Sequence, residues 1–338
     1  MTAYSKIFIV VLNWNGRDDT LACLDSVFKI DYPNFDVVVV DNGSTDDSVP
    51  AIRKAFPQSY LIETKKNLGY AEGNNVGMRY ALEQETDFIF ILNNDTKVAP
   101  DILNHLLEAF DDHPKAAALG PVVYEMNRPE IIWTAGEFFD KDGYPYSAKQ
   151  GDTQIPTNSN KVLETEWING AAFFSRFDIL KNIGLFDSRF FLTYEDSDWC
   201  FRARKMGYSC LMVPNARIWH KVASSFDSES SPLRAYYSTR NKLLFAEKNL
   251  PKLEWLRRLL CHLSFLIPKM NFTLPFHSNP SLYLKWLFWK IREAYHLWNN
   301  PRQKAIRFGI RDYFLRRFGE CPRNIWELQS QWKQLKQK

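Results

Sequence analysis

The sequence has few cysteines, no long apolar run and no internal repeat, and each lack excludes a class of protein. Its five cysteines are odd in number and widely spaced and form no Cys-x-x-Cys pair, which argues against a disulfide framework or a zinc knuckle and favours a reducing compartment. No stretch approaches the roughly 20 uninterrupted apolar residues that a membrane-spanning helix needs. The apolar run at residues 7–12 is too short for a secretory signal and is typical of a β-strand. We therefore expect a cytoplasmic protein, with membrane contact only from the side.

Charge is distributed unevenly along the chain. The net charge of +4 combines a basic part, residues 233–338, with 21 Lys and Arg against 6 Asp and Glu, and an acidic remainder with 22 against 33. This asymmetry predicts an anionic partner for the basic part, such as a membrane surface, a nucleic acid or a phosphorylated substrate. We expect no nucleic-acid partner, because no nucleic-acid-binding motif accompanies the charge.

Up to about residue 123 the sequence alternates between apolar runs and segments of helical periodicity. Continuous β-branched runs separated by helices predict an α/β fold with a mainly parallel sheet covered by helices on both faces. Beyond them lies a segment rich in Gly, Pro, Ser and Asn, residues 142–160, which we interpret as a mobile loop. We expect an α/β domain over residues 1–232 and a helical, basic, aromatic-rich segment over 233–338. The apolar runs are residues 7–12, 35–41, 59–63, 88–92 and 116–123.

Polar residues follow each of the first four apolar runs. The segments read "NWNG", "DNGSTDDS", "KKNLGYAEGNN" and "NNDT". Any one of them is explained as a turn or a helix cap, since Asn, Asp and Gly favour both. In a parallel sheet, however, ligands bind outside the carboxyl ends of the strands. Four such segments on one rim therefore predict a ligand site there.

Asp95 is the only full charge in the segment "LNND". A carboxylate at a strand end suits a divalent cation held beside a phosphate, because Mg²⁺ and Mn²⁺ take few protein oxygens and share the rest with substrate and water. The alternative is an aspartate that caps the following turn. His220 has two interpretations as well, as a core histidine or as a metal ligand.

The segment "YEDSDWCFR" gathers three acids at an expected helix start. Asp198 and Arg202 are i and i+4 neighbours and can pair as part of the structure. Glu195 and Asp196 point elsewhere, and carboxylates crowded in this way can have a raised pKa that suits a general base. A salt-bridged helix start without chemistry is the alternative interpretation.

Six segments carry a resemblance to a known family. They are "VVLNWNG", "VVVVDNGSTDDS", "NLGYAEGNNVG", "LNNDT", "WINGAAFFSR" and "FFLTYEDSDWCFRARKMGY", in the expected order over residues 5–225. Together they resemble family 2 of the inverting glycosyltransferases, which has the Rossmann-like GT-A fold, and within it bacterial rhamnosyltransferase-type members. The resemblance implies transfer of a sugar, with rhamnose a candidate, from a nucleoside-diphosphate sugar to a hydroxyl of a glycan or lipid-linked acceptor in cell-surface polysaccharide synthesis.

The resemblance also implies a role for each polar residue of the rim. A divalent cofactor, Mg²⁺ or Mn²⁺, would be held by Asp95 and, as a second ligand, His220. Asp196 would be the catalytic base, and the acceptor side would comprise Gly170, Ala171 and Glu195. The donor nucleotide would be contacted by Asn13, Asn15, Asp41, by Asn67, Gly69 and Asn74 in a closing loop, and by Asn93, which replaces the first acid of the family's DxD motif.

Two other functions remain open at this point. A sugar-nucleotide nucleotidyltransferase would be expected to carry a Gly-rich loop with basic residues after the first strand, of which "NWNGRDD" is a poor version. A non-catalytic nucleotide-sugar-binding relative is conceivable because "NND" has lost one acid. Retention of Asp95, Asp196 and His220 argues against it, since a relative released from catalysis needs none of them.

Two segments of the basic part, "WLRRLLCHLSFLIPKM" and "SLYLKWLFWKIREAYHLW", combine apolar faces with basic neighbours and Trp at the edges. Helices that lie in a membrane interface have this composition. The alternative is a helical subdomain whose apolar faces pack on the catalytic body, and the two can coexist. We expect peripheral attachment at the cytosolic membrane face, where a lipid-linked acceptor would be found.

Overall fold

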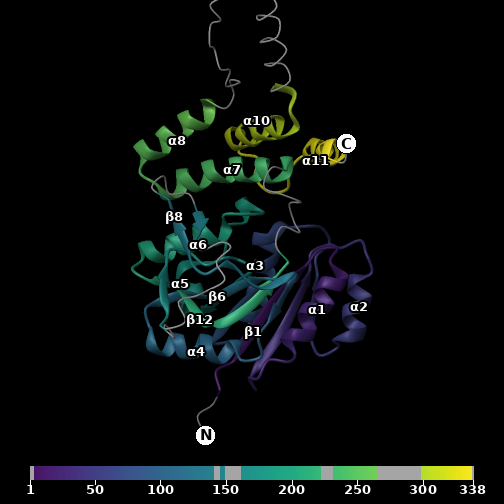
Figure 1. Ribbon diagram of the computed structural model, residues 1–338, viewed down its shortest axis with the longest axis vertical. Coiled ribbons are helices and arrows are strands. Elements are labelled where there is room, and N and C mark those ends of the chain that lie inside the picture. The colour runs from purple at the N-terminus through teal and green to yellow at the C-terminus, as the bar shows by residue number, and fades with distance from the viewer. Residues whose placement is uncertain (1–3, 141–144, 149–160, 222–230, 265–297, 337–338) are drawn as a thin grey trace, which may run out of the picture. The chain divides into compact units, whose positions relative to one another are not determined.

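The computed structural model describes residues 4–140, 145–148, 161–221, 231–264 and 298–336 (Figure 1). The chain divides into two compact units, Met1–Val222 and Ala223–Lys338, called here the N-terminal and the C-terminal unit. The domain boundary expected after residue 232 falls at the start of helix α7 and stays a prediction.

The N-terminal unit is built on a mixed sheet. In the described residues it has ten strands, with the order β10-β12-β6-β11-β4-β1-β2-β3 and with β5 paired to β12 and β7 to β6. The strands β1 (Ile7–Asn13), β2 (Phe35–Asp41), β3 (Tyr60–Glu63) and β4 (Phe88–Asn93) are mutually parallel. Their carboxyl ends therefore meet at one edge, with Asn13 opposite Asp41 and Leu12 opposite Asn93.

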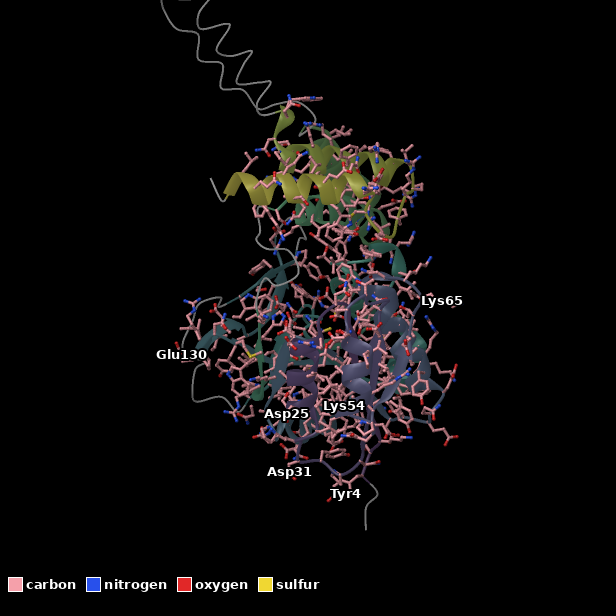
Figure 2. All side chains as sticks on the ribbon, turned by 90° about the vertical axis from the view of Figure 1, so that its right-hand side faces the viewer. Tyr4, Asp25, Asp31, Lys54, Lys65 and Glu130 are labelled. Carbon is pink, nitrogen blue, oxygen red and sulfur yellow. The ribbon has the colours of Figure 1, made fainter. Side chains whose placement is uncertain are left out.

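Helices cover both faces of this sheet, because successive residues of each buried strand point to opposite sides. Ile7, Ile9 and Val11 pack with α1, α2 and α4, whereas Phe8 and Val10 pack with α3, α5 and α6. Asp25 on α1 and Lys54 on α2 point away from the sheet in Figure 2. The helices are α1 (Arg17–Val27), α2 (Ser48–Ala55), α3 (Gly69–Leu82), α4 (Ile102–Asp112), α5 (Phe177–Ile183) and α6 (Glu195–Lys205), with the 3₁₀ turn η1 (Ser188–Phe190).

The second half of the sheet completes the fold. Strand β11 runs antiparallel between β4 and β6, and β12 is parallel to β6. Most of the loop expected over residues 142–160 lies outside the described residues, but its Pro145–Ser147 forms β9, paired with β8. The strands are β5 (Thr96–Val98), β6 (Ala116–Glu125), β7 (Arg128–Thr134), β8 (Glu137–Phe139), β10 (Leu163–Thr165), β11 (Ala172–Arg176) and β12 (Ser209–His220).

Helix α3 corrects one expectation from the sequence. Gly69 and Asn74 were expected in a loop, but α3 begins at Gly69 and contains both. Gly69 has a φ of +81°, and the next residue, Tyr70, donates its N–H to the Phe191 carbonyl at 2.6 Å, which holds the helix start. A Cβ at Gly73 would lie 2.6 Å from Leu12, so the helix lies tightly on β1. Glycines and asparagines disfavour helices locally, and this packing overrides that preference.

The C-terminal unit is helical in its described part. It consists of α7 (Pro232–Asn249), α8 (Lys252–Ser264), α10 (Pro301–Phe314) and α11 (Arg323–Lys336). Helix α7 forms its centre, where Tyr236, Tyr237, Leu244 and Phe245 are buried and a Cβ at Gly309 of α10 would meet the Tyr236 carbonyl at 2.7 Å. Of the second amphipathic segment, 281–298, only Trp298 lies within the described residues. Among the described residues, no helix combines the length and apolar character needed to cross a membrane.

Candidate functional site

The ends of β1 and β2 are joined by a buried polar network. Asn13 is fully buried, and its Nδ2 donates to Asp41 Oδ1 at 2.7 Å while its Oδ1 accepts from Thr20 Oγ1 at 2.7 Å. Asp41 Oδ2 accepts from the Ser44 N–H at 3.0 Å. Both predicted nucleotide-contacting residues therefore hold the loop after β2 in a fixed conformation.

Asn15 and Asn67 shape the two loops beside this network. Asn15 is in the left-handed region with a φ of 51°, and its Oδ1 accepts from the Thr45 N–H at 2.7 Å. The side chain of the preceding Trp14 is 44% exposed on the same rim. Asn67 Oδ1 accepts from the Gly69 N–H at 2.8 Å, so it serves the start of α3.

Asp95 and His220, the two predicted metal ligands, lie together. Strand β5 pairs with β12 so that Thr96 is opposite His220, which brings Asp95 Oδ1 to 3.1 Å from His220 Nε2. Both residues are buried, and the Trp133 ring lies 5.2 Å from the imidazole. Asn93, the residue in place of the first DxD acid, has its Nδ2 3.5 Å from His220 Nε2.

This pair fits a divalent cation of the Mn²⁺ or Mg²⁺ type. A carboxylate oxygen and an imidazole nitrogen on one side of a site are suitable ligands, and the buried Asn93 Oδ1 beside them has no hydrogen-bond partner among the residues that the structure describes. In the part of the chain that the structure describes, no third His, Cys, Asp or Glu joins them. The remaining coordination would have to come from substrate phosphates and water.

Asp196 lies at the start of α6, where its carboxylate accepts backbone hydrogen bonds on both oxygens. The Gly170 N–H donates to Oδ2 at 2.8 Å, and the Ser197 N–H donates to Oδ1 at 2.6 Å. Burial raises the pKa of Asp196, and these hydrogen bonds lower it in part. A carboxylate of raised pKa, held in one orientation, can act as a general base.

Glu195, next to Asp196, has a different environment. It is 4% exposed, and its Oε2 is buried without a hydrogen-bond partner in the described residues. Burial, together with the negative charge of Asp196, raises the pKa of Glu195 well above its usual value, which favours its protonated form. The predicted structural pair is present, with Asp198 Oδ2 3.1 Å from Arg202 Nε.

Gly170 and Ala171, predicted on the acceptor side, lie between Asn93, beside the Asp95–His220 pair, and Asp196. The Ala171 carbonyl accepts from the Asn93 N–H at 3.0 Å, and the Gly170 N–H binds Asp196. A Cβ at Gly170 would lie 2.9 Å from the Tyr70 hydroxyl and 3.3 Å from Asp196 Oδ2. A side chain at position 170 would therefore crowd Tyr70, and glycine fits this turn of residues 169–171 without such a contact.

Tyr70 is a site residue that the sequence reasoning missed. Its hydroxyl donates to the Gly170 carbonyl, and its pKa is raised well above the usual value by burial and by the charges of Glu195, Asp196 and Asp95. One phenol thus lies within electrostatic reach of all three carboxyls. The signal in the sequence was an aromatic residue inside the polar segment "NLGYAEGNN".

Several buried polar atoms around this edge lack a partner in the described residues. Such atoms are uncommon in folded proteins, and a group of them on one rim indicates a site that a polar ligand completes. Asn74 illustrates the pattern, since its Nδ2 donates to the Tyr70 carbonyl at 2.9 Å while its Oδ1 accepts nothing. The atoms are Asn74 Oδ1, Asn93 Oδ1, Glu195 Oε2 and His220 Nδ1.

Known proteins resemble this chain both in sequence and in fold. The family model "Glycosyl transferase family 2" matches residues 8–177, half of the chain. The chain belongs to this family. Among its curated relatives, the dTDP-rhamnosyl transferase RfbF of Shigella flexneri is 25% identical over 255 residues, which cover 72% of this chain and 81% of the relative. The N-acetylglucosaminyl-diphospho-decaprenol L-rhamnosyltransferase of Mycobacterium tuberculosis is 26% identical over 235 residues, 63% of this chain and 75% of the relative.

Solved structures give the same fold. The mannosyltransferase PcManGT from Pyrobaculum calidifontis, in complex with GDP-Man and Mn²⁺, aligns with a TM-score of 0.55 and 16% identity over 94% of this chain and 89% of its own. GalNAc-T7 with UDP, GalNAc and Mn²⁺ aligns with a TM-score of 0.56 and 13% identity over 78% of this chain and 58% of its own. The predicted family and GT-A fold are confirmed, and the chain is a glycosyltransferase.

Proposed function

We propose that this glycosyltransferase moves a sugar, with inversion, from a nucleoside-diphosphate sugar to an acceptor hydroxyl at the carboxyl edge of its sheet. The observation that carries the proposal is the meeting of an Asp95–His220 pair and an oriented Asp196 around Tyr70. The Asp95–His220 pair suits the diphosphate end of a donor, and the Asp196 carboxylate suits the acceptor hydroxyl. The network of Asn13 and Asp41 and the loops of Asn15 and Asn67 would surround the nucleoside.

Asp95 and His220 would hold Mg²⁺ or Mn²⁺, which when bound would neutralise charge on the departing diphosphate. Because Asn93 takes the place of an acid, the chain offers one carboxylate and one imidazole here. Asn93 can donate hydrogen bonds to phosphate oxygens through its amide, which an acid at this position could not do. We therefore expect metal binding to depend on the donor's own phosphates.

Asp196 would take the proton of the acceptor hydroxyl as that oxygen attacks the anomeric carbon. The new C–O bond forms on the face opposite the bond between the anomeric carbon and the diphosphate. That bond breaks, and the nucleoside diphosphate leaves with its electron pair, so the configuration of the anomeric carbon inverts. The N–H groups of Gly170 and Ser197 would keep the carboxylate aimed during this step. Glu195, whose raised pKa favours the protonated form, would donate a hydrogen bond to the acceptor.

For donor and acceptor, the names of the relatives supply the first candidates. Two of them are rhamnosyltransferases, and one of these acts on an N-acetylglucosaminyl-diphospho-decaprenol. We propose rhamnose from a dTDP-linked donor and a glycan or lipid-linked acceptor, in cell-surface polysaccharide synthesis.

Incubation with a panel of nucleotide sugars, with and without Mn²⁺ or Mg²⁺, tests the proposal. We expect metal-dependent release of nucleoside diphosphate, greatest with an acceptor present. Pyrophosphate-dependent chemistry would instead indicate a sugar-nucleotide nucleotidyltransferase. Binding without turnover on any acceptor would indicate a non-catalytic relative.

We further propose that the C-terminal unit attaches the enzyme to the cytosolic face of a membrane. On α8, Leu253, Leu256 and Leu260 are 81%, 44% and 59% exposed and lie on one face, beside the exposed basic residues Lys252 and Arg257. We call these three residues the leucine stripe. Interfacial helices combine such an apolar face with basic neighbours that meet anionic lipid. The opposite side of α8 buries Arg258, Leu259 and His262, so this helix is both packed and exposed.

A further inference from the structure

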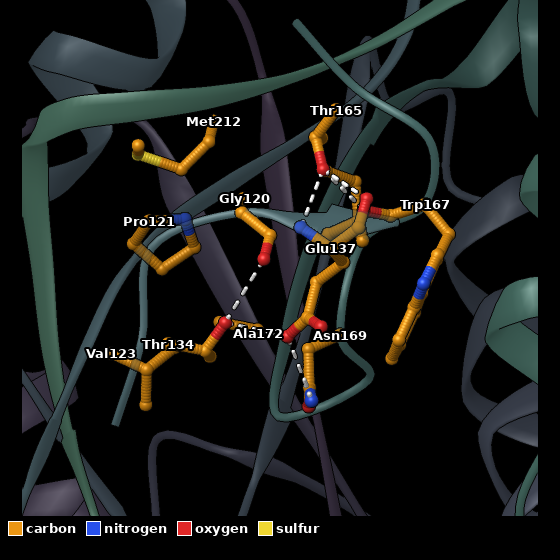
Figure 3. Close-up of a pocket in the computed structure, with 12 residues that line it drawn as sticks. Gly120, Pro121, Val123, Thr134, Glu137, Thr165, Trp167, Asn169, Ala172 and Met212 are labelled. Carbon is orange, nitrogen blue, oxygen red and sulfur yellow. Dashed lines mark hydrogen bonds between the residues drawn. The ribbon is translucent and has the colours of Figure 1, made fainter. Parts of the chain in front are cut away.

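The turn that holds Asp196 is itself supported from behind. Asn169 Oδ1 accepts from the Ala171 N–H at 2.9 Å, and Asn169 Nδ2 lies 3.4 Å from Glu137 Oε1. Figure 3 shows the Glu137 carboxyl pointing toward Asn169. Thr134 Oγ1 donates to the same Glu137 oxygen at 2.8 Å. A chain of contacts thus runs from Glu137 through Asn169 to the turn whose Gly170 N–H binds Asp196.

Glu137 is buried, with 4% of its surface exposed, and begins strand β8. Its Oε1 accepts two hydrogen bonds, whereas its Oε2 has no hydrogen-bond partner in the described residues. Beside the carboxyl lies a cavity of about 20 Å³, lined also by Thr134, Trp167 and Met212, which is room for one water molecule (Figure 3). This arrangement suits a neutral carboxylic acid whose Oε1 accepts the hydrogen bonds of Thr134 and Asn169.

The surrounding charges favour the neutral acid as well. Burial raises the pKa of Glu137 to about 8, the charge of Asp196 adds to this, and the hydroxyls of Ser147 and Thr134 and the Asn169 amide lower it in part. Arg204 of α6 pairs with Glu166 at 3.0 Å. On the neighbouring strands, Arg128 and Glu130 of β7, Tyr146 of β9 and Glu164 of β10 are exposed, and Cys210 of β12 is buried.

We propose that Glu137 is a positioning residue that, as a neutral acid, holds the turn of residues 169–171 from behind and so places the Gly170 N–H on Asp196. Glu137 touches neither substrate nor metal in this role, and the proposal rests on the function proposed above. Loss of its proton would bury a second negative charge near Asp196 and weaken the support of the turn. The base would then be held correctly only while Glu137 keeps its proton.

The Gly170 amide reports on this role without any substrate. In protein labelled with ¹⁵N-glycine and ¹³C-carbonyl asparagine, only glycines that follow asparagine give correlated signals, and residues 16, 43 and 170 are those glycines. We expect the Gly170 signal of the wild type to show a titration step with an apparent pKa of about 8, and we expect that step to be absent in Glu137→Gln, where only the responses to Asp196 and Glu195 remain. The same titration in Glu137→Gln and in the wild type would overturn the proposal.

Turnover supplies the second readout. Glu137→Ala should lower kcat roughly 10- to 100-fold with little change in the donor KM, because a misplaced base costs rate more than binding. Glu137→Gln, which keeps the shape and the acceptor oxygen, should rescue most of this loss and should not show the decline in kcat above pH 8 that the wild type shows. Glu164→Gln, at an exposed carboxylate on β10, is the matched control and should follow the wild type. An unchanged kcat and pH profile in Glu137→Ala would overturn the proposal. If the wild type turns over no nucleotide sugar, the proposed function fails, and the Gly170 titration still decides the role of Glu137.

Discussion

In the part of the chain that the structure describes, the N-terminal unit has four buried polar atoms without hydrogen-bond partners around the carboxyl edge of its sheet, whereas the C-terminal unit has exposed leucines on α8. The N-terminal unit exposes only scattered large apolar residues, such as Tyr60 and Met206, and no exposed leucine occurs among its described residues. Among the described residues of the C-terminal unit, Leu253 is 81% exposed. The buried polar atoms of the N-terminal unit suit its proposed partner, a phosphorylated sugar donor. The exposed leucines of the C-terminal unit suit its proposed partner, a membrane.

Both units also bury charge, and the difference between the two cases is informative. Arg240 is fully buried in the C-terminal unit, but its Nη1 donates to the Gly319 carbonyl at 2.7 Å and it lies against the rings of Tyr236 and Tyr237. Asp312 accepts from the Tyr236 hydroxyl at 2.9 Å. Burial of a charged residue is thus a structural device there, whereas around the carboxyl edge of the sheet four buried polar atoms without a hydrogen-bond partner in the described residues lie together.

The largest expected effect is on turnover, and it distinguishes Asp196 at the site from Asp312, a buried aspartate with a structural role. Asp196→Asn should lower turnover roughly 10²- to 10⁴-fold, as loss of a general base does, and should leave donor affinity near normal. Asp312→Asn should leave kcat near normal and lower the free energy of unfolding by about 1–3 kcal/mol, because it disturbs a buried hydrogen-bonded group. Steady-state kinetics and thermal unfolding of both variants measure this. Unchanged turnover in Asp196→Asn would remove that residue from the chemistry.

The exposed side of the comparison is tested with lipid vesicles. Replacing the leucine stripe by serine should weaken binding to anionic vesicles, measured by flotation, by about 10³-fold, since each leucine that leaves the lipid costs on the order of 1.4 kcal/mol. Serine at Tyr60 and Met206, exposed apolar residues of the N-terminal unit, is the control and should not change binding. Equal flotation of both variants, or none of the wild type, would contradict membrane attachment through α8.

Replacing one closely packed glycine in each unit by alanine compares the effect of crowding at the site with its effect in the helical core. In Gly170→Ala the new methyl would meet the Tyr70 hydroxyl and Asp196, so we expect about tenfold lower kcat, partly restored by adding Tyr70→Phe. In Gly309→Ala it would meet the Tyr236 backbone, so we expect lower thermal stability, by about 1–3 kcal/mol, with kcat retained. The prediction fails if both variants lose activity and stability in the same proportion.

The smallest effect concerns stability and pH. The pKa of Glu137 is raised from 4.5 to about 8, so the native state keeps a proton that the unfolded chain has lost in this range, and stability falls as the pH rises through it. Glu137→Gln lacks this group, so its free energy of unfolding relative to the wild type should rise by on the order of 3 kcal/mol between pH 5 and pH 8. Thermal unfolding of both proteins across this range measures the gain. A constant difference between them would mean that Glu137 does not titrate there.

The sheet and the rim were predictable because they depend on local pattern. Buried parallel strands leave continuous apolar runs, and their polar ends, Asn13, Asp41 and Asn93, meet at one edge by the geometry of the fold. The Asp95–His220 contact was expected only through the family resemblance, since 125 residues separate the two in the chain and the pairing of β5 with β12 brings them together.

Other features depend on contacts that no local pattern records. The start of α3 is fixed by the carbonyl of Phe191, far along the chain, so Gly69 and Asn74 looked like loop residues. Glycines repeat at four-residue spacing here, and those at 73 and 77 lie against Leu12 and Val10 of β1, so the repeat was the signal of a helix packed closely on a strand. Glu137 was missed because its burial arises from strands that join only in the folded unit.

Binding of Mn²⁺ to the wild type, measured by electron paramagnetic resonance with and without nucleoside diphosphate, tests most directly the claim that the unpartnered edge is a metal and diphosphate site. The account predicts weak binding to the free protein, at least about tenfold tighter binding with the nucleotide, and loss of that gain in Asp95→Asn, because among the described residues only Asp95 and His220 meet there as ligands. Asp25→Asn, at an exposed carboxylate of α1, should behave as the wild type. Tight binding to the free protein, or a gain that survives Asp95→Asn, would contradict the account.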